Sequence, residues 1–310
     1  MKACIVTFAL IFFALFTCTV FSRCSSGDLD ANGLPKKLFM AMDGGDKPGQ
    51  TKAAMEPFRL YLEKKLGMPV EIFFTTDYTA VIEALRAKKV QIAQMAPFAY
   101  ILATQKPGIT PVATFGADGK PSLYHAVIIT SPATGIKTMA DVKARAKNLT
   151  LCFSDPASTS GHLIPRAYLN TIGLNPDNAF KQVIFAGSHA ATILSVKSGK
   201  VDVGCTNIDL SLEKMIREGD VKKDDFVILW TSPPIINDVI VVRSDVNAAF
   251  MKKIQSAFTD ANKDDNKAFS SYVKLYYSST QNMAYIPIRD SDYNGLRRIA
   301  GKVKDFKLSK

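Results

Sequence analysis

The feature that most constrains the fold of this chain is a repeated alternation of short apolar runs with segments of helical periodicity. Residues 37–41 form the first apolar run. Phe58, Leu62 and Leu66 then recur at helical spacing, and a second apolar run follows at residues 70–74. Strands that alternate with helices of about 10 to 15 residues are typical of an α/β domain with a largely parallel sheet. We therefore expect the α/β class.

The same alternation continues along the chain and fits either one large sheet or two lobes. Ligands of open α/β sheets bind at the carboxyl ends of the strands, so residues that follow strands are the first candidates for a site. The further expected strands are residues 90–93, 126–130, 149–153, 183–185, 201–205, 226–231 and 239–242; the further expected helices are residues 79–88, 139–146, 161–172 and 189–198, with a helical segment from about residue 246.

Residues 1–24 have the pattern of a signal peptide. Lys2 precedes an almost unbroken apolar stretch from Ile5 to Phe21. A stretch of about 17 residues lies at the lower limit for crossing a bilayer, so an uncleaved anchor is the alternative. In either case we expect a protein that leaves the cytoplasm.

A cysteine directly after this segment resembles the lipidation site of bacterial lipoproteins. Cys24 is our candidate, because the polar stretch 25–35 that follows would serve as a flexible tether. Arg23 occupies a position where small residues are usual, and Cys18 is the alternative site. We expect a lipid-anchored extracytoplasmic protein.

The charge balance favours anionic partners. The formal net charge of +11 falls by two, to +9, when Lys2 and Arg23 are removed with the N-terminal segment. Such a charge suits attraction to anionic solutes, but the lysines are spread along the chain. No dense basic block with interleaved aromatic residues occurs, so we expect no nucleic-acid binding.

Two cysteines, Cys152 and Cys205, lie in the remainder of the chain. Both fall in apolar runs, and we expect them to be small core residues, with a disulfide as the alternative. No metal-binding spacing is present, and we expect neither a metal nor a cofactor.

The segment Ser158-Thr159-Ser160-Gly161 leaves an expected strand and enters an expected helix. A helix start presents up to four unpaired N–H groups and the positive end of the helix dipole, and hydroxyl groups add donors. Gly161 would let the backbone approach a ligand. One hydroxyl could be an ordinary N-cap, but three successive hydroxyl residues exceed that need. The nucleotide-binding pattern GxxxxGK[ST] is absent.

Other polar residues also stand at expected strand ends or helix starts. Each has an ordinary explanation in packing, capping or turn chemistry, and their spacing does not show that they meet. These residues are Tyr78, Tyr124, His189, Asp209 and Asp238.

Taken together, several segments resemble the periplasmic phosphonate-binding family of ABC importers, whose members include phosphite and phosphate binders. The resemblance extends from about Lys37 to Asp292. It is carried by residues 71–86, by 155–161, by 187–189, by 201–203 with Asn207 and Asp209, and by Ser232-Pro233 with Asn237-Asp238.

The resemblance implies a type II periplasmic binding protein, in which two α/β lobes close over a solute in the cleft between them. The first lobe would comprise residues 36–129 and 239–310, and the second residues 130–238. It also implies a receptor that delivers its solute to a membrane permease, without catalysis, and we expect a monomer.

The resemblance further implies the roles of the site residues. Ser158, Thr159 and Ser160 match positions that grip the phosphonate oxygens. Three others, Tyr78, Tyr124 and His189, match positions that complete the hydrogen-bonding shell.

The acidic residues Asp209 and Asp238 match positions that face the ammonium group in aminoalkylphosphonate binders, although Asp209 is shorter than the expected Glu. Because two carboxylates beside a dianion would repel it, the pair favours an aminoalkylphosphonate such as 2-aminoethylphosphonate, or a protonated oxyanion. Phosphite, methylphosphonate and phosphate are the alternatives.

Two other classes of function are alternatives to a phosphonate-binding receptor. One is an enzyme that acts on a phosphorylated metabolite, but no Ser/His/Asp order, HExxH or CxxC pattern is present. The other is a receptor of the same fold for a pyrimidine or thiamine precursor, which would require aromatic stacking in the cleft and no Ser-Thr-Ser loop.

Overall fold

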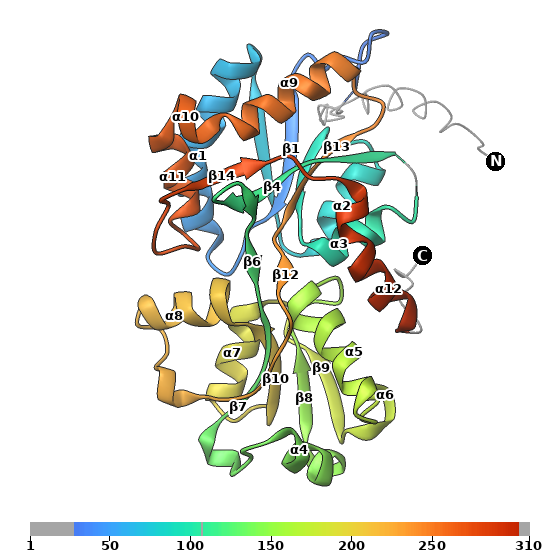
Figure 1. Ribbon diagram of the computed structural model, residues 1–310, viewed down its shortest axis with the longest axis vertical. Coiled ribbons are helices and arrows are strands. Elements are labelled where there is room, and N and C mark those ends of the chain that lie inside the picture. The colour runs from blue at the N-terminus through green and yellow to red at the C-terminus, as the bar shows by residue number, and fades with distance from the viewer. Residues whose placement is uncertain (1–27, 107, 304–310) are drawn as a thin grey trace, which may run out of the picture.

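The computed structural model describes residues 28–106 and 108–303, and shows two α/β lobes stacked along the long axis of the molecule (Figure 1). Cys24 and Cys18, the two expected lipidation sites, lie outside the described residues. Among the residues described, no helix is both long enough and apolar enough to cross a membrane.

The first lobe is built on a sheet with strand order β14-β4-β13-β3-β1-β2. The strand β1 is parallel to β2 and β3, whereas β13 is antiparallel to β3 and β4, and β14 is antiparallel to β4. A short β5 pairs with β4. The strands are β1 (Leu38–Asp43), β2 (Val70–Thr75), β3 (Ile92–Met95), β4 (Ile109–Ala117), β5 (Lys120–Pro121), β13 (Val239–Arg243) and β14 (Met283–Ile286).

Helices cover both faces of this sheet because its central strands are apolar on both sides. In β1, Leu38 and Met40 pack in one core with Phe58, whereas Phe39 and Ala41 pack in a second core on the other face. The helices of this lobe are α1 (Pro48–Leu66), α2 (Tyr78–Arg86), α3 (Pro97–Ala103), α9 (Ala248–Thr259), α10 (Ala261–Asp264), α11 (Asn266–Val273) and α12 (Asn294–Lys302).

The second lobe has a five-stranded sheet with strand order β11-β7-β10-β8-β9. In this sheet β10, β8 and β9 are parallel, and β7 is antiparallel to both of its neighbours. The elements are β7 (Ala126–Thr130), α4 (Met139–Arg145), β8 (Thr150–Phe153), α5 (Ile164–Thr171), α6 (Pro176–Ala179), β9 (Gln182–Phe185), α7 (His189–Lys197), β10 (Val203–Asn207), α8 (Glu213–Arg217) and β11 (Val227–Thr231).

Cys152 and Cys205 are buried free thiols on the adjacent strands β8 and β10. Their side chains belong to different hydrophobic clusters, one on each face of the sheet. Both cysteines are therefore core residues, as expected, and the alternative of a disulfide is wrong.

The expected α/β class is confirmed, but the sheets are mixed and not largely parallel. Each lobe has a parallel set of strands, to which antiparallel strands are added: β13 and β14 in the first lobe and β7 in the second. The strand β7 lies in the second sheet, so the lobe boundary expected at residue 129 is a few residues late. Local alternation of apolar residues identifies a strand but not the sheet that it joins.

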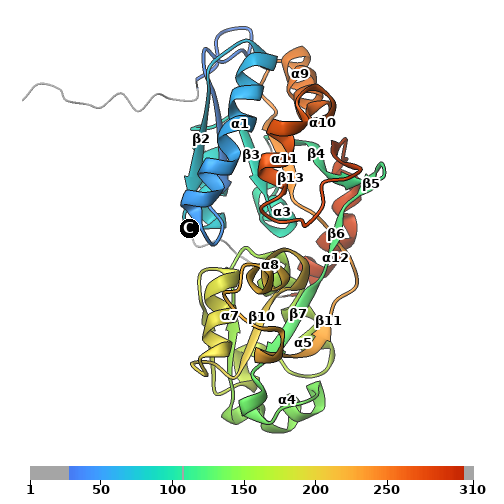
Figure 2. The same cartoon turned by 90° about the vertical axis from the view of Figure 1, so that its left-hand side faces the viewer.

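Two extended segments connect the lobes. β6 (Leu123–Tyr124) and β12 (Ile235–Ile236) pair antiparallel and run side by side between the sheets (Figures 1 and 2). On one side of this connection α12 contacts α3 of the first lobe and α5 of the second. This arrangement leaves a space between the lobes at the ends of several central strands.

Candidate ligand-binding site

A cavity of about 110 Å³ lies between the lobes. This volume is well above the roughly 10–15 Å³ that a single buried water requires, so the cavity has room for a small ligand. The cavity brings together seven of the eight residues expected to bind the ligand: Tyr78, Tyr124, Ser158, Thr159, Ser160, His189 and Asp238.

The loop after β8 combines a helix cap with open donors. Ser158 is the N-cap, because its Oγ accepts a hydrogen bond of 2.9 Å from the amide of Gly161. The turn Thr159–Leu163 is π-helical, with a bond of 3.0 Å from the amide of Leu163 to the carbonyl of Ser158. The amides of Thr159 and Ser160 have no acceptor among the described residues. The loop therefore combines capping, through Oγ of Ser158 as acceptor, with donors that an anion could use: two amides and the hydroxyl protons.

Gly161 allows this loop to pack closely against the neighbouring strand and helix. A Cβ atom at Gly161 would lie 2.5 Å from Cβ of Ser154 and 3.0 Å from Cε1 of His189. Distances this short are not tolerated between such atoms, so the position of the loop depends on glycine here.

His189 is the first residue of α7, and its ring lies against the loop. Its Nδ1 is 3.0 Å from Oγ1 of Thr206 and 3.2 Å from Oγ of Ser154, while its Nε2 is 3.5 Å from Oγ of Ser158. Burial lowers the pKa of His189, so the imidazole is neutral at neutral pH. A neutral ring can donate or accept one hydrogen bond in the cavity.

Two tyrosines line the cavity. One comes from the first lobe and the other from β6, one of the two segments that connect the lobes. Tyr78 begins α2, for which Asp77 is the N-cap, and Tyr124 ends β6. Burial raises the pKa of both phenols, although hydrogen bonding with Ser160 and Thr159 partly offsets this effect at Tyr124. Both hydroxyl groups are therefore neutral donors at neutral pH.

Among the acidic side chains that line the cavity, Asp238 and Asp43 of the first lobe have a strongly raised pKa. Oδ2 of Asp238 accepts a long hydrogen bond of 3.4 Å from Nε2 of Gln94, and burial raises its pKa to about 6. The second acid, Asp43, was not among the expected site residues. Burial and the charge of Asp238 raise its pKa to about 7. The sequence feature that could have identified Asp43 is its position at the carboxyl end of the first strand.

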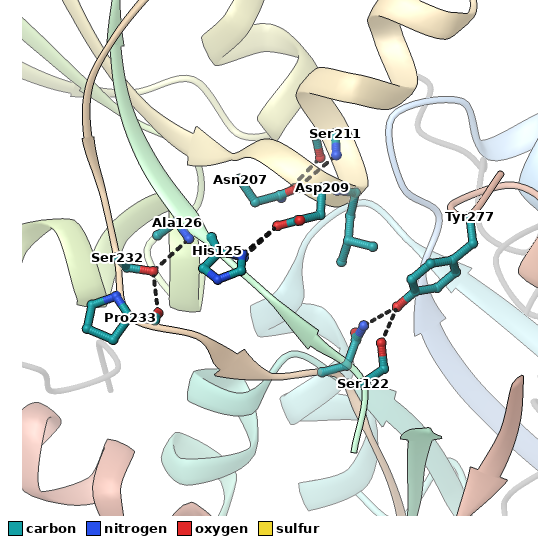
Figure 3. Close-up of polar contacts among 11 residues, drawn as sticks. Ser122, His125, Ala126, Asn207, Asp209, Ser211, Ser232, Pro233 and Tyr277 are labelled. Carbon is teal, nitrogen blue, oxygen red and sulfur yellow. Dashed lines mark hydrogen bonds and ion pairs between the residues drawn. The ribbon is translucent and has the colours of Figure 1, made fainter. Parts of the chain in front are cut away.

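Asp209 is the one expected site residue that does not line the cavity. Its Oδ2 accepts a hydrogen bond of 2.7 Å from the amide of His125 and lies 3.3 Å from Nδ1 of the same residue (Figure 3). The π-helical turn Ile208–Leu212 turns this side chain toward the hinge. Asn207, Leu210 and Ser211 of the same segment line the cavity instead, so the structure does not bring Asp209 together with the other expected site residues.

The lobes also touch at the edge of the cavity. Oδ1 of Asp46, in the first lobe, accepts a hydrogen bond of 2.9 Å from the amide of Ala190 in α7. Nζ of Lys47 lies 2.7 Å from a carboxylate oxygen of Glu218 and of Asp220, both in the second lobe. The structure thus has its lobes in direct contact around the cavity.

Comparison with known proteins identifies the family. Residues 45–293 match the family model described as "ABC transporter, phosphonate, periplasmic substrate-binding protein". This chain belongs to that family. Its members bind a substrate and are not enzymes, so the protein is the phosphonate-type binding component of an ABC importer. The alternative of an enzyme is wrong.

Two curated relatives cover most of the chain. The phosphate-import protein PhnD of Mycolicibacterium smegmatis is 28% identical over 297 residues, which are 90% of each chain. The phosphonates-binding periplasmic protein of Escherichia coli is 29% identical over 266 residues, 84% of this chain and 78% of the relative.

Solved structures agree on the fold. A binding component of an ABC phosphonate transporter from Pseudomonas aeruginosa is 26% identical, with a TM-score of 0.73 over 85% of each chain. PhnD1 of Prochlorococcus marinus in complex with methylphosphonate has a TM-score of 0.74 at 22% identity, covering 86% of this chain and 98% of that one. The expected two-lobed periplasmic binding fold is thereby confirmed.

Proposed function

We propose that this protein captures an aminoalkylphosphonate, with 2-aminoethylphosphonate as the reference ligand, and delivers it to a permease in the cytoplasmic membrane. One observation carries the proposal. The open amides of Thr159 and Ser160 and the carboxylate of Asp238 line the same small cavity, so a single ligand with an anionic and a cationic end can satisfy both.

In this proposal the second lobe binds the phosphonate. Backbone amides at the π-helical turn and the hydroxyl groups of Ser158, Thr159 and Ser160 bind its oxygens. Tyr78, Tyr124 and His189 complete the hydrogen-bonding shell.

Phosphite, methylphosphonate and phosphate are the competing ligands. A relative is named a phosphate-import protein and another was solved with methylphosphonate, so these ligands belong in the same test. None of the three carries a cation to place beside Asp238. Binding any of them as a dianion would leave a buried carboxylate close to an added negative charge, which is unfavourable, whereas a protonated oxyanion could donate its O–H to Asp238.

Isothermal titration of the purified protein with these four ligands tests the proposal. We expect 2-aminoethylphosphonate to bind most tightly. Replacing Ser158 or Ser160 by Ala should cost about 1–3 kcal/mol of binding free energy for each lost hydrogen bond to the charged ligand. Ser291→Ala, at an exposed position, is the matched control. Absence of binding heat with all four ligands at micromolar protein would refute the assignment.

We further propose that Cys24 carries a lipid that holds a monomeric receptor at the outer face of the cytoplasmic membrane or in the periplasm. The support is the sequence pattern alone, and Cys18 is the competing site. Replacing Cys24 by Ser should move the protein from the membrane fraction to the soluble fraction, whereas Cys18→Ser should not. The opposite result would assign the lipid to Cys18.

A further inference from the structure

One wall of the ligand cavity is made of hydrogen-bond acceptors from three adjacent strands. Asp43 ends β1, Gln94 lies in β3, and Asp238 directly precedes β13. The strand β3 lies between the other two in the sheet, and all three side chains line the cavity. The sheet of the first lobe therefore presents these groups together to a ligand held by the loop of the second lobe.

Gln94 supplies a buried acceptor that lacks a donor. Its side chain is only 6% exposed, and its Nε2 donates a hydrogen bond of 2.8 Å to the hydroxyl of Tyr272. Its Oε1 is buried and has no hydrogen-bond partner in the part of the chain that the structure describes. A buried acceptor of this kind is costly unless a ligand brings a donor to it.

The basic residues that line the cavity are already paired elsewhere. Nζ of Lys47 bonds to Glu218 and Asp220 at 2.7 Å, and Nζ of Lys214 lies 2.8 Å from Glu218. Among the described residues, no lysine, arginine or histidine forms an ion pair with Asp43 or Asp238. Within the part of the chain that the structure describes, these two carboxylates therefore have no cationic side chain as a partner, and a ligand ammonium can supply one.

The other carboxylates of the cavity each accept a hydrogen bond from a backbone amide, as Asp43 does from Gly45. These pairs are Asp46 with Ala190, Asp77 with Ala80 and Asp155 with Ala157. Asp43 uses only Oδ1 locally, for the amide of Gly45 at 2.8 Å, and Asp238 has the long bond from Gln94. Oδ2 of Asp43 and Oδ1 of Asp238 therefore accept no hydrogen bond from the residues that the structure describes and are available to a ligand.

We infer that Asp43, Gln94 and Asp238 form the subsite that recognises the ammonium group, with Asp43 in the role expected of Asp209. An ammonium group has three N–H donors, which matches one acceptor from each of the three side chains. This inference rests on the proposed function, because the loop of the second lobe must hold the phosphonate end.

The titration behaviour of the carboxylates supports the subsite. Burial, then the charge of Asp238, and to a smaller extent Asp46 and Asp155, raise the pKa of Asp43 to about 7. The nearby phenols of Tyr78 and Tyr276 are neutral, since burial raises the pKa of each. At neutral pH, part of the unliganded protein therefore holds a proton on Asp43. A ligand ammonium would displace that proton.

The test compares 2-aminoethylphosphonate with propylphosphonate, in which a methyl group replaces the ammonium. Calorimetric titrations at pH 7, in two buffers of different ionisation enthalpy and without primary amines, give both affinity and proton release. The variants are Asp43→Asn, Gln94→Met and Asp209→Asn. Asp224→Asn, at an exposed position, is the control for loss of one distant negative charge.

We expect Asp43→Asn to weaken binding of 2-aminoethylphosphonate at least tenfold and to abolish most of the proton release. Gln94→Met should weaken the same ligand selectively. Binding of propylphosphonate should change less than about twofold in both variants, which also shows that they are folded. Equal losses for both ligands, no loss in Asp43→Asn, or a selective loss in Asp209→Asn instead would overturn the subsite.

The wild-type protein separates this inference from the proposed function. If it binds propylphosphonate as tightly as 2-aminoethylphosphonate, the ammonium subsite is wrong while phosphonate binding stands. If it binds neither ligand, both the proposed function and the subsite fail.

Discussion

The side-chain oxygen of Thr159, in the second lobe, accepts a hydrogen bond of 2.8 Å from the backbone amide of Phe98, in the first lobe. Thr159 also lines the ligand cavity. The same residue therefore belongs to the anion-binding loop and to the contact between the lobes. Ligand binding at this loop and approach of the lobes are physically linked through one side chain.

Replacing Thr159 by Val should weaken ligand binding, because Val keeps the shape but removes the hydroxyl that joins Phe98 to the loop and that we propose also binds the phosphonate. Loss of a hydrogen bond of this kind costs about 1–3 kcal/mol, which corresponds to about a 5- to 150-fold rise in Kd. Thr159→Ser keeps the hydroxyl and should change Kd by less than about threefold. Titration calorimetry measures both. Equal Kd values for Thr159→Val and the wild type would show that the Thr159 hydroxyl contributes neither through Phe98 nor through the ligand.

Replacing Gly161 by Ala should displace the loop, since the new Cβ would lie 2.5 Å from Cβ of Ser154 and 3.0 Å from Cε1 of His189. We expect at least a tenfold loss of affinity for the ligand and a destabilisation of about 1–3 kcal/mol from overpacking. Gly301→Ala in α12 is the control, because its Cβ would meet no atom within 4 Å. Urea unfolding and calorimetry together test the prediction. Wild-type affinity in Gly161→Ala would contradict it.

Much of the fold could be predicted from local apolar patterns, as α1 illustrates. Phe58, Leu62 and Leu66 are buried as their spacing indicated, and Gly67 ends the helix with a positive φ of 74°. The strand β4 was missed because Pro111 interrupts its pattern. The sheet accommodates Pro111 at an irregularity in the pairing with β13. Such a bulge depends on the partner strand, which the local sequence does not reveal.

The site residues that could be predicted are those whose role follows from their own position in the sequence. The three hydroxyl residues of the loop and His189 stand at helix starts, and the sequence identifies such positions directly. Gln94 was not predicted, because a single polar residue in an apolar strand gives no indication of the cavity that the second lobe creates. The direction of Asp209 depends on a π-helical turn, whose extra residue per turn changes which side chain faces the cavity.

Replacing Lys47 by Gln should weaken ligand binding about two- to fivefold. Lys47 joins the first lobe to Glu218 and Asp220 of the second, and exposed ion pairs of this kind contribute little individually. The effect should shrink at about 0.3 M salt, where exposed charges are screened. Lys65→Gln removes a comparable ion pair, to Asp264, that lies within the first lobe, and it should leave Kd unchanged. A similar loss in both variants would show that the interlobe position of Lys47 is irrelevant.

Replacing Asp43 by Asn should stabilise the unliganded protein at alkaline pH. The folded-state pKa of Asp43 is raised from the ordinary value of 3.8 to about 7, so the folded protein holds this proton more tightly than the unfolded chain does. The free energy of unfolding of the wild-type protein therefore decreases as pH rises from about 4 to about 7. The Asp43→Asn variant lacks this decrease, because it has no carboxylate at this position. The gain in free energy of unfolding of Asp43→Asn over the wild type should be near zero at pH 4 and at most about 4 kcal/mol at pH 8. Urea unfolding at both pH values measures this difference.

Asp141→Asn provides a control of opposite sign. Hydrogen bonds from Lys137 and Thr138 lower the pKa of Asp141, so its carboxylate stabilises the protein above the ordinary pKa, and this contribution is lost as pH falls. Asp141→Asn should therefore destabilise the protein at pH 8 and do so less at low pH. If Asp43→Asn behaves in the same way, the carboxylate of Asp43 is already balanced within the protein. If Asp43→Asn instead gains stability at pH 8 and loses affinity for the amino ligand, the cavity holds an unbalanced carboxylate that only the ligand completes.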